Sequence, residues 1–87
     1  MTDGQGRMLI LGGDDGSFAA ADLGPRHPGF CRAILKLDEA GWREIGALPH
    51  AVVTTGIARW SAGAAIPGGE DRPGRRSSRV LFLEGLF

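Results

Sequence analysis

The chain alternates between short apolar runs and polar, glycine-rich connections. The first run, Met8 to Leu11, holds four consecutive apolar residues and ends at Gly12-Gly13. A run that is apolar at every position is typical of a strand buried on both faces. We therefore expect a buried strand here, followed by a tight exit at the two glycines, which tolerate positive φ. Residues 1–6 show no such pattern, and we expect a disordered N-terminus.

Two further strands are expected in the first half of the chain. The stretch from Phe30 to Asp38 alternates, and one of its sides is purely apolar: Cys31, Ala33, Leu35 and Leu37. This side is expected to face the core. The sequence Asp38-Glu39-Ala40-Gly41 predicts a turn, and Trp42 to Ile45 predicts a short third strand. Before them, residues 14–29 form a polar connection long enough to be either functional or disordered.

The same order of patterns begins again at Val52. Val52 to Trp60 is rich in β-branched and apolar residues and predicts a strand, and Ser61-Ala62-Gly63 predicts a turn. The run Ala64 to Pro67 then ends at Gly68-Gly69, as the first run ends at its own glycine pair. Ser78 to Glu84 predicts a last strand that ends in an acidic residue.

The two halves match at two different spacings. Leu37-Asp38 corresponds to Leu83-Glu84 at a separation of 46 residues, whereas 56 residues separate Gly12 from Gly68. The longer connection in the first half accounts for the difference. A repeat of about 50 residues with one glycine pair and one tryptophan per unit has the period of a kelch-type propeller blade. Trp42 and Trp60 are then expected in the blade cores.

Composition supports a β-rich chain and excludes several classes of partner. Fifteen glycines among 87 residues, spread over turn-like places, favour many short strands. Ten basic and ten acidic residues cancel, so nothing points to nucleic acid or an anionic membrane as partner. No apolar run has the length of a membrane span, and the N-terminal residues lack the apolar segment of a signal peptide. The single cysteine, Cys31, and the histidines have no zinc-site spacing, so we expect neither metal nor cofactor.

Potential chemistry gathers between Ala64 and Arg79. This stretch carries Glu70 and Asp71 directly after a glycine pair, and four arginines around Pro73-Gly74: Arg72, Arg75, Arg76 and Arg79. In the first half, Asp14 and Asp15 occupy the corresponding place. Solvated loop acids, and surface arginines paired with acids, are the plainer interpretation of these side chains.

The order of features resembles the kelch repeat. An apolar run, a glycine pair, a loop, a strand ending in an acid, a turn, Trp42 and Leu48-Pro49 follow one another as in that repeat. The resemblance covers roughly residues 8–84. It implies an all-β fold, a kelch-type β-propeller of which this chain supplies about one and a half blades of antiparallel strands. Residues 7–51 would be one blade unit and residues 52–87 a partial second unit.

A narrower resemblance concerns residues 67–77. Gly69-Glu70, Pro73-Gly74, Arg76 and Ser77 match the pattern of the cyclically permuted mutarotases, the kelch propellers that include N-acetylneuraminate epimerase, a sialic acid mutarotase. The resemblance implies that Glu70 is the catalytic base and that Arg76 binds the substrate carboxylate. A positioned carboxylate can move the protons that anomer exchange requires, and a guanidinium matches a carboxylate in bidentate fashion.

Further residues are candidates for substrate binding beside this pair: Arg72, Asp14, Asp15 and His27. The Pro73-Gly74 turn is expected to fold the chain back so that Glu70 and Arg76 face one cavity. Because a propeller needs about four to eight blades, the chain is expected to be an incomplete propeller and inactive alone. Missing blades or self-association would complete it.

Three functions remain open at this point. The first is an isomerase of carbohydrate metabolism that interconverts sugar-acid anomers. The second is a non-catalytic kelch module that binds protein or glycan through loops 14–29 and 68–77, and the third is a truncated chain with no function. Full-length relatives of the resembled family are periplasmic or secreted.

Overall fold

Short apolar segments of the chain fold as antiparallel β-strands joined by glycine-rich turns. The computed structural model describes residues 1–18, 23 and 26–85. Three strands in this part of the chain form the first sheet, in the order β1-β2-β3, and three form the second sheet, in the order β4-β5-β8. Strands β6 and β7 pair separately as a small hairpin. The strands are β1 (Leu9–Leu11), β2 (Ala33–Asp38), β3 (Gly41–Ala47), β4 (Ala58–Trp60), β5 (Gly63–Pro67), β6 (Glu70–Arg72), β7 (Arg75–Arg76) and β8 (Val80–Leu83).

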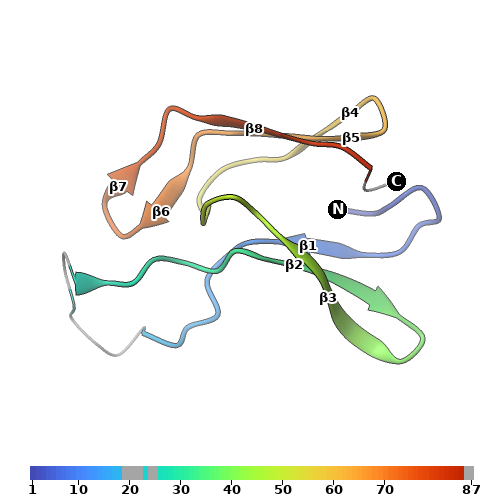
Figure 1. The fold of residues 1–87 in the computed structure, drawn as a ribbon, viewed down its shortest axis with the longest axis horizontal. Helices are drawn as coiled ribbons and strands as arrows, with labels where there is room; N and C mark the ends of the chain where they lie inside the picture. Colours follow the sequence, from blue (N-terminus) through green and yellow to red (C-terminus); the bar gives the residue numbers. More distant parts are fainter. Residues whose placement is uncertain (19–22, 24–25, 86–87) are drawn as a thin grey trace.

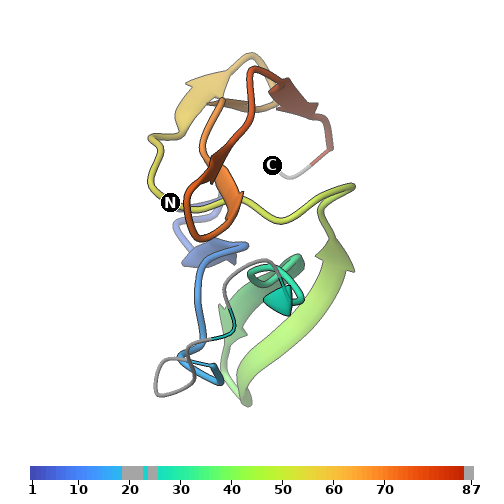
Figure 2. The same ribbon diagram turned by 90° about the vertical axis from the view of Figure 1, so that its left-hand side faces the viewer.

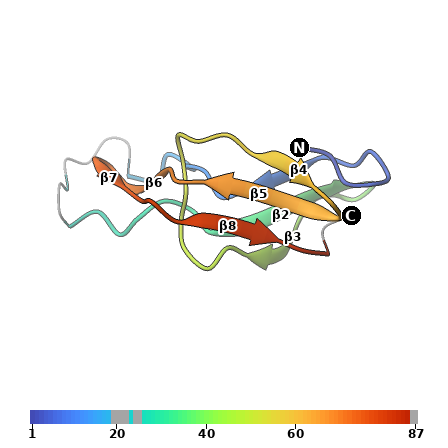
Figure 3. The same ribbon diagram turned by 90° about the horizontal axis from the view of Figure 1, so that it is seen from above.

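The two larger sheets lie one over the other. Figure 1 shows the second sheet above the first, with the connection from β3 passing between them. Figure 2, seen from the end, separates the same two layers. The β6–β7 hairpin extends beyond the sheets at the end opposite the chain termini, as Figures 1 and 3 show. At this end the hairpin meets the segment that leads into β2, where the amide of Phe30 donates to Asp71 O.

The register of the strands contains an internal repeat. Leu11 pairs with Ile34 between β1 and β2, and Pro67 pairs with Val80 between β5 and β8. These residues correspond at the spacings of 56 and 46 seen in the sequence. The β1–β2 and β5–β8 pairs are thus two versions of one unit.

Hydrogen bonds at the glycine pairs repeat in the same way. The amide of Gly12 donates to Ala33 O at 2.9 Å, and that of Gly68 donates to Arg79 O at 2.7 Å. The carbonyls of Gly13 and Gly69 each accept a 2.8 Å bond, from the amides of Cys31 and Ser77. All four glycines have positive φ, between 63° and 99°. This confirms the sequence prediction that the glycine pairs make tight exits from their strands.

The core lies between the two sheets. It consists of buried apolar side chains from both sheets and from the segment that connects them: Ile34, Leu48, Val52 and Ile66, with Leu11, Leu81 and Leu83 against them. Leu48 has no exposed surface. Its amide donates to Arg32 O at 2.7 Å, and its carbonyl accepts a 2.8 Å bond from Arg32 Nε. The connecting segment is therefore fixed to the first sheet while its side chain fills the space between the layers.

The face of β2 that points to the core differs from the expected one. Ile34 is buried, whereas Leu37 is 37% exposed. Pairing with β1 places Ile34 on the side of Leu11, and the second sheet covers that side. Both sides of this strand carry apolar residues, and the position of the second sheet decides which side is buried.

The stretch from Val52 to Trp60 is not one strand. Only Ala58–Trp60 forms a strand, β4, and Val53 makes an isolated bridge to Glu70. Thr54 has a φ of 55°, a left-handed conformation that interrupts an extended chain. Val52 is buried in the core.

Both tryptophans lie on the surface of this chain. Trp42 is 47% exposed and Trp60 is 67% exposed, so neither belongs to the core between the sheets. Each lies on the face of its sheet that is turned away from the other sheet. The expectation that they fill blade cores is not met within a single chain.

Residues 1–6 form a defined turn where we expected disorder. The side chain of Asp3 is only 4% exposed and lies 3.0 Å from Lys36 Nζ. Its Oδ1 accepts hydrogen bonds from the amides of Gln5 and Arg7, each at 2.9 Å. The Arg7 backbone hydrogen bond is the main cause that lowers the pKa of Asp3 from 3.8 to about 2, with Lys36 and Gln5 adding to it. Asp3 therefore fixes this segment, because it accepts hydrogen bonds within the turn and pairs with Lys36 of β2.

Lowering the pH should reduce the stability of the fold by protonating Asp3. Because the folded state lowers the pKa of this carboxyl, the carboxylate stabilises the fold. This contribution to stability is complete above about pH 3.8 and is lost as the pH falls toward about 2. We expect Asp3→Asn to be less stable than the parent chain at neutral pH and to match it near pH 2. Urea-unfolding midpoints across this range measure the difference. Glu39→Gln, in the exposed β2–β3 turn, is the control, and an unchanged pH profile in Asp3→Asn would contradict the assignment.

Candidate functional site

The β6–β7 hairpin brings Glu70 and Arg76 together. Pro73-Gly74 forms its turn, with Gly74 at a φ of 74°. Glu70 and Arg76 are paired across the two strands, and Arg76 Nη2 lies 3.6 Å from Glu70 Oε1. The amide of Gly74 donates to Glu70 Oε2 at 3.4 Å. The turn that the sequence predicted thus juxtaposes the two residues proposed for catalysis.

Backbone contacts hold Glu70 from its other side. Its amide and carbonyl exchange hydrogen bonds of 2.9 and 2.8 Å with Val53. The Glu70 side chain is 19% exposed and that of Arg76 is 68% exposed. The carboxylate is therefore partly shielded and fixed, while the guanidinium reaches into solvent and could meet a ligand.

A small polar cavity lies beside the hairpin. Its volume is about 240 Å³, and its lining combines three arginines with one carboxylate, one histidine and two serines: Arg75, Arg76, Arg79, Asp71, His50, Ser77 and Ser78. Three guanidinium groups against one carboxylate favour an anionic ligand. Arg76 lines this cavity and Glu70 does not, so the two residues do not line one cavity as the sequence predicted.

Asp71 balances part of the positive charge. Its Oδ2 lies 3.4 Å from Arg75 Nε and its Oδ1 lies 3.9 Å from Arg72 Nε. Among the described residues, Asp71 Oδ1, Arg72 Nε and His50 Nε2 are buried without a hydrogen-bond partner. Arg72 thus faces Asp71 and is not among the residues that line the cavity. Buried polar atoms without partners are uncommon, and two of these three belong to cavity-lining residues, His50 and Asp71, beside which a ligand or water could bind.

Asp14 and Asp15 support the loop that follows the first glycine pair. Asp14 Oδ1 accepts the amide of Gly16, and Asp15 Oδ1 accepts the amide and hydroxyl of Ser17. The hydroxyl of Ser17 is the first cause that lowers the pKa of Asp15. Both acids are exposed, and their side chains act within their own turn rather than on the hairpin.

His27 is a buried part of the same loop. It is 9% exposed, and its ring contacts Phe18 and Phe30 with centroids 5.5 and 5.2 Å away. Its Nδ1 accepts the amide of Gly29 at 3.0 Å. These contacts position the loop, and the ligand-binding role that the sequence suggested for His27 finds no geometric support in them.

The two loops at this end of the molecule are joined through their backbones. The amide of Phe30 donates to Asp71 O at 2.8 Å, and the amide of Gly13 donates to Val52 O at 3.2 Å. Figure 1 shows the segment that leads into β2 running beneath the β6–β7 hairpin. The loop of residues 26–30 is therefore held against the hairpin, although none of its residues lines the polar cavity.

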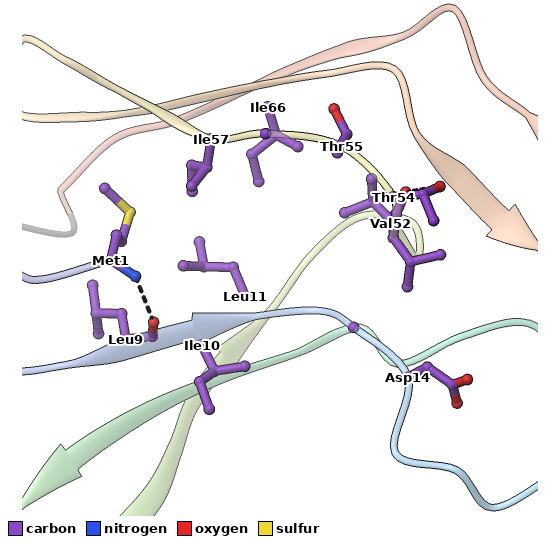
Figure 4. Close-up of a pocket in the computed structure, with 13 residues that line it drawn as sticks. Met1, Leu9, Ile10, Leu11, Asp14, Val52, Thr54, Thr55, Ile57 and Ile66 are labelled. Atoms are coloured by element: carbon purple, nitrogen blue, oxygen red, sulfur yellow. Dashed lines mark hydrogen bonds between the residues drawn. The ribbon is translucent and has the colours of Figure 1, made fainter.

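A second, apolar cavity lies between the sheets. It measures about 460 Å³ and is lined mostly by aliphatic and small residues, with Asp14 at one end. Figure 4 shows Leu11 and Ile66 pointing toward each other across it, and Ile10 on the opposite side of β1. Its two ionisable groups, the Met1 α-amine and the Asp14 carboxylate, lie at opposite ends of it in Figure 4, so we place the candidate site at the hairpin.

His50 and Asp71 were not among the site residues predicted from the sequence. His50 follows Pro49 in a turn and has no motif of its own, and Asp71 is one of two adjacent acids. Their place in the cavity depends on the β3–β4 connection meeting the hairpin. The isolated β-bridge between Val53 and Glu70 joins the two segments, and no local sequence pattern predicts it.

Comparisons with protein-family models, curated proteins and solved structures found no match to this chain. The kelch and mutarotase resemblance therefore depends on the residues of the chain alone. In the described part of the chain, no helix has the length and apolar character needed to span a bilayer. Within the same residues, no group of three or more acidic, histidine or cysteine side chains converges as metal ligands would.

Proposed function

We propose that the chain provides the anion-binding and proton-transfer part of a sugar-acid mutarotase built as a kelch-type propeller. The observation that carries the proposal is the ion pair that joins Glu70 to Arg76, one of the three arginines that line the polar cavity. Glu70 would take the proton of the anomeric hydroxyl and return one to the ring oxygen. Arg76 would hold the sugar carboxylate.

The size of the cavity limits what one chain can bind. Pockets for whole small-molecule ligands measure about 300–1,000 Å³, and this cavity measures about 240 Å³. It can accept the carboxylate end of a sugar acid and leaves the rest of the ring uncovered. The remaining walls would come from further blades, which agrees with weak or absent activity of a single chain.

Binding of a sugar acid tests the first half of the proposal. We expect N-acetylneuraminate to shift the amide resonances of residues 70–79 in heteronuclear NMR spectra, and we expect neutral N-acetylmannosamine to leave them unchanged. Arg76→Lys keeps the charge and loses the planar fork, so affinity should fall about tenfold, equivalent to about 1.4 kcal/mol. Arg43→Lys, in β3, is the matched control. Equal shifts from the neutral sugar would contradict carboxylate recognition.

Anomer exchange tests the second half. We expect this chain, in a propeller completed by further blades, to accelerate exchange between the anomers of N-acetylneuraminate, as measured by NMR. Glu70→Gln should reduce that acceleration about 10²–10⁴-fold, the usual contribution of a general base. Glu39→Gln should retain it.

A non-catalytic glycan-binding module is the second candidate function. It is favoured by the two loops that meet at the hairpin through the bond from Phe30 to Asp71. Such a module would bind the sugar acid without accelerating exchange at any concentration, and would tolerate Glu70→Gln. Absence of both binding and acceleration would contradict both functions.

A further inference from the structure

The outer face of the first sheet is mostly apolar, with one exposed acid, Glu44, opposite Leu35. Residues on alternate positions of its strands point away from the second sheet, and strand pairing places Ile10 beside Leu35 and Leu37 beside Trp42. Ile10 is 42%, Leu37 37% and Trp42 47% exposed. We refer to Ile10, Leu35, Leu37 and Trp42 as the first outer face.

The outer face of the second sheet is apolar as well. Ala65 pairs with Phe82 and Pro67 pairs with Val80, and Trp60 lies on the same side of β4. Trp60, Val80 and Phe82 are 67%, 49% and 64% exposed. We refer to Trp60, Ala65, Val80 and Phe82 as the second outer face. Sheets that are apolar on both faces are typical of sheets covered on both sides, and contiguous exposed apolar surface marks an interaction site.

The internal repeat shows which surfaces correspond. On the first outer face, Ile10, Leu35 and Leu37 occupy the places that Ile66, Leu81 and Leu83 occupy in the second unit. In the second unit these residues contact the core between the sheets. The first outer face is therefore the repeat equivalent of a surface that is already covered.

The second outer face has a covered equivalent too. Val80 corresponds to Ile34, and Ala65 corresponds to Leu9. Ile34 is 7% and Leu9 is 2% exposed, because both lie on the inner side of the first sheet. The two sheets thus meet through faces that are not repeat equivalents of each other. The first and second outer faces are the repeat equivalents of these two contacting faces, and they remain uncovered.

We propose that a second copy of this chain binds by repeating the contact between the two sheets. The first outer face of one copy would cover the second outer face of the next. The contact is heterologous, since it joins two different patches, and such contacts generate closed rings when the rotation closes. The formal net charge of zero adds no overall repulsion between copies. This inference does not depend on the proposed enzymatic function.

Sedimentation velocity of the chain and of two variants tests the proposal. Phe82→Arg places a charge in the second outer face, and Trp42→Arg places one in the first outer face. Ala40→Arg, in the exposed β2–β3 turn, adds an arginine outside both faces and is the control. We expect the parent chain and Ala40→Arg to form multimers. Each face variant alone should associate at least about 30-fold more weakly, the loss of one interface hot spot.

Mixing the two face variants is the decisive measurement. Each retains the face that the other lacks, so an equimolar mixture should form a one-to-one dimer and no larger species. A symmetric contact between two copies of one face would instead leave one variant as self-associated as the parent and would contradict the proposal. A parent chain that stays monomeric at all concentrations would also overturn it.

A second pair of substitutions guards against unfolded variants. Val80→Lys and Leu37→Lys change the same two faces at other positions, and circular dichroism establishes whether the strands persist in each variant. The same dimer from this pair supports the proposal. Folded variants of either pair that do not combine when mixed would overturn it.

Discussion

Replacing Leu48 by alanine should cost the fold about 2–5 kcal/mol, the range for a fully buried leucine. Leu48 has no exposed surface and contacts the core that joins the two sheets. Both of its backbone groups are bonded to Arg32, so the segment cannot move in to fill the space that the side chain leaves. We therefore expect the upper half of this range.

Thermal and urea unfolding measure the effect. A chain of this length is stabilised by about 4–13 kcal/mol at the usual figure per residue. The loss is a large share of this stability and should lower the melting temperature by about 15–40 °C. Ile45→Ala, at a position 40% exposed in β3, is the control and should cost much less. Equal losses in the two variants would show that Leu48 does not connect the sheets.

The sequence predicted the strands and their order better than the faces they bury. Apolar runs and glycine pairs are local features, and they located β1, β5 and β8 and the exits that follow two of them. The choice between Ile34 and Leu37 as the buried residue of β2 depends on which side the second sheet covers. The alternation favoured the purely apolar side of Leu37, because a local pattern does not show which side a distant sheet will cover.

The candidate site was predictable where it depended on a turn. Pro73-Gly74 closes a hairpin of few residues, so the meeting of Glu70 and Arg76 follows from local geometry. The loop acids and His27 had chemistry suited to a ligand, yet turn hydrogen bonds and aromatic contacts occupy them. The contribution of His50 arises from contact between distant segments, which composition and spacing do not reveal.

Gly69→Ala should destabilise the fold more than Gly13→Ala, although the two glycines are repeat equivalents. Both have positive φ, 93° and 99°, so each alanine variant pays about 1–3 kcal/mol of backbone strain. A Cβ on Gly69 would also lie 2.5 Å from Val52 Cγ2 and 2.7 Å from Val53 O. Relieving such a clash in a filled region costs about 1–3 kcal/mol more.

The Gly13→Ala variant separates the cost of backbone strain from the cost of the steric clash. No described atom lies within 4 Å of a Cβ built on it, so Gly13→Ala measures the strain alone, and the difference between the urea midpoints of the two variants measures the clash. Because Val53 also bonds the backbone of Glu70, Gly69→Ala should shift the NMR resonances of the hairpin as well, and Gly13→Ala should not. Equal destabilisation of the two variants, with unshifted hairpin resonances, would contradict the close contact of Val52 and Val53 with Gly69. It would also mean that the turn alone positions Glu70.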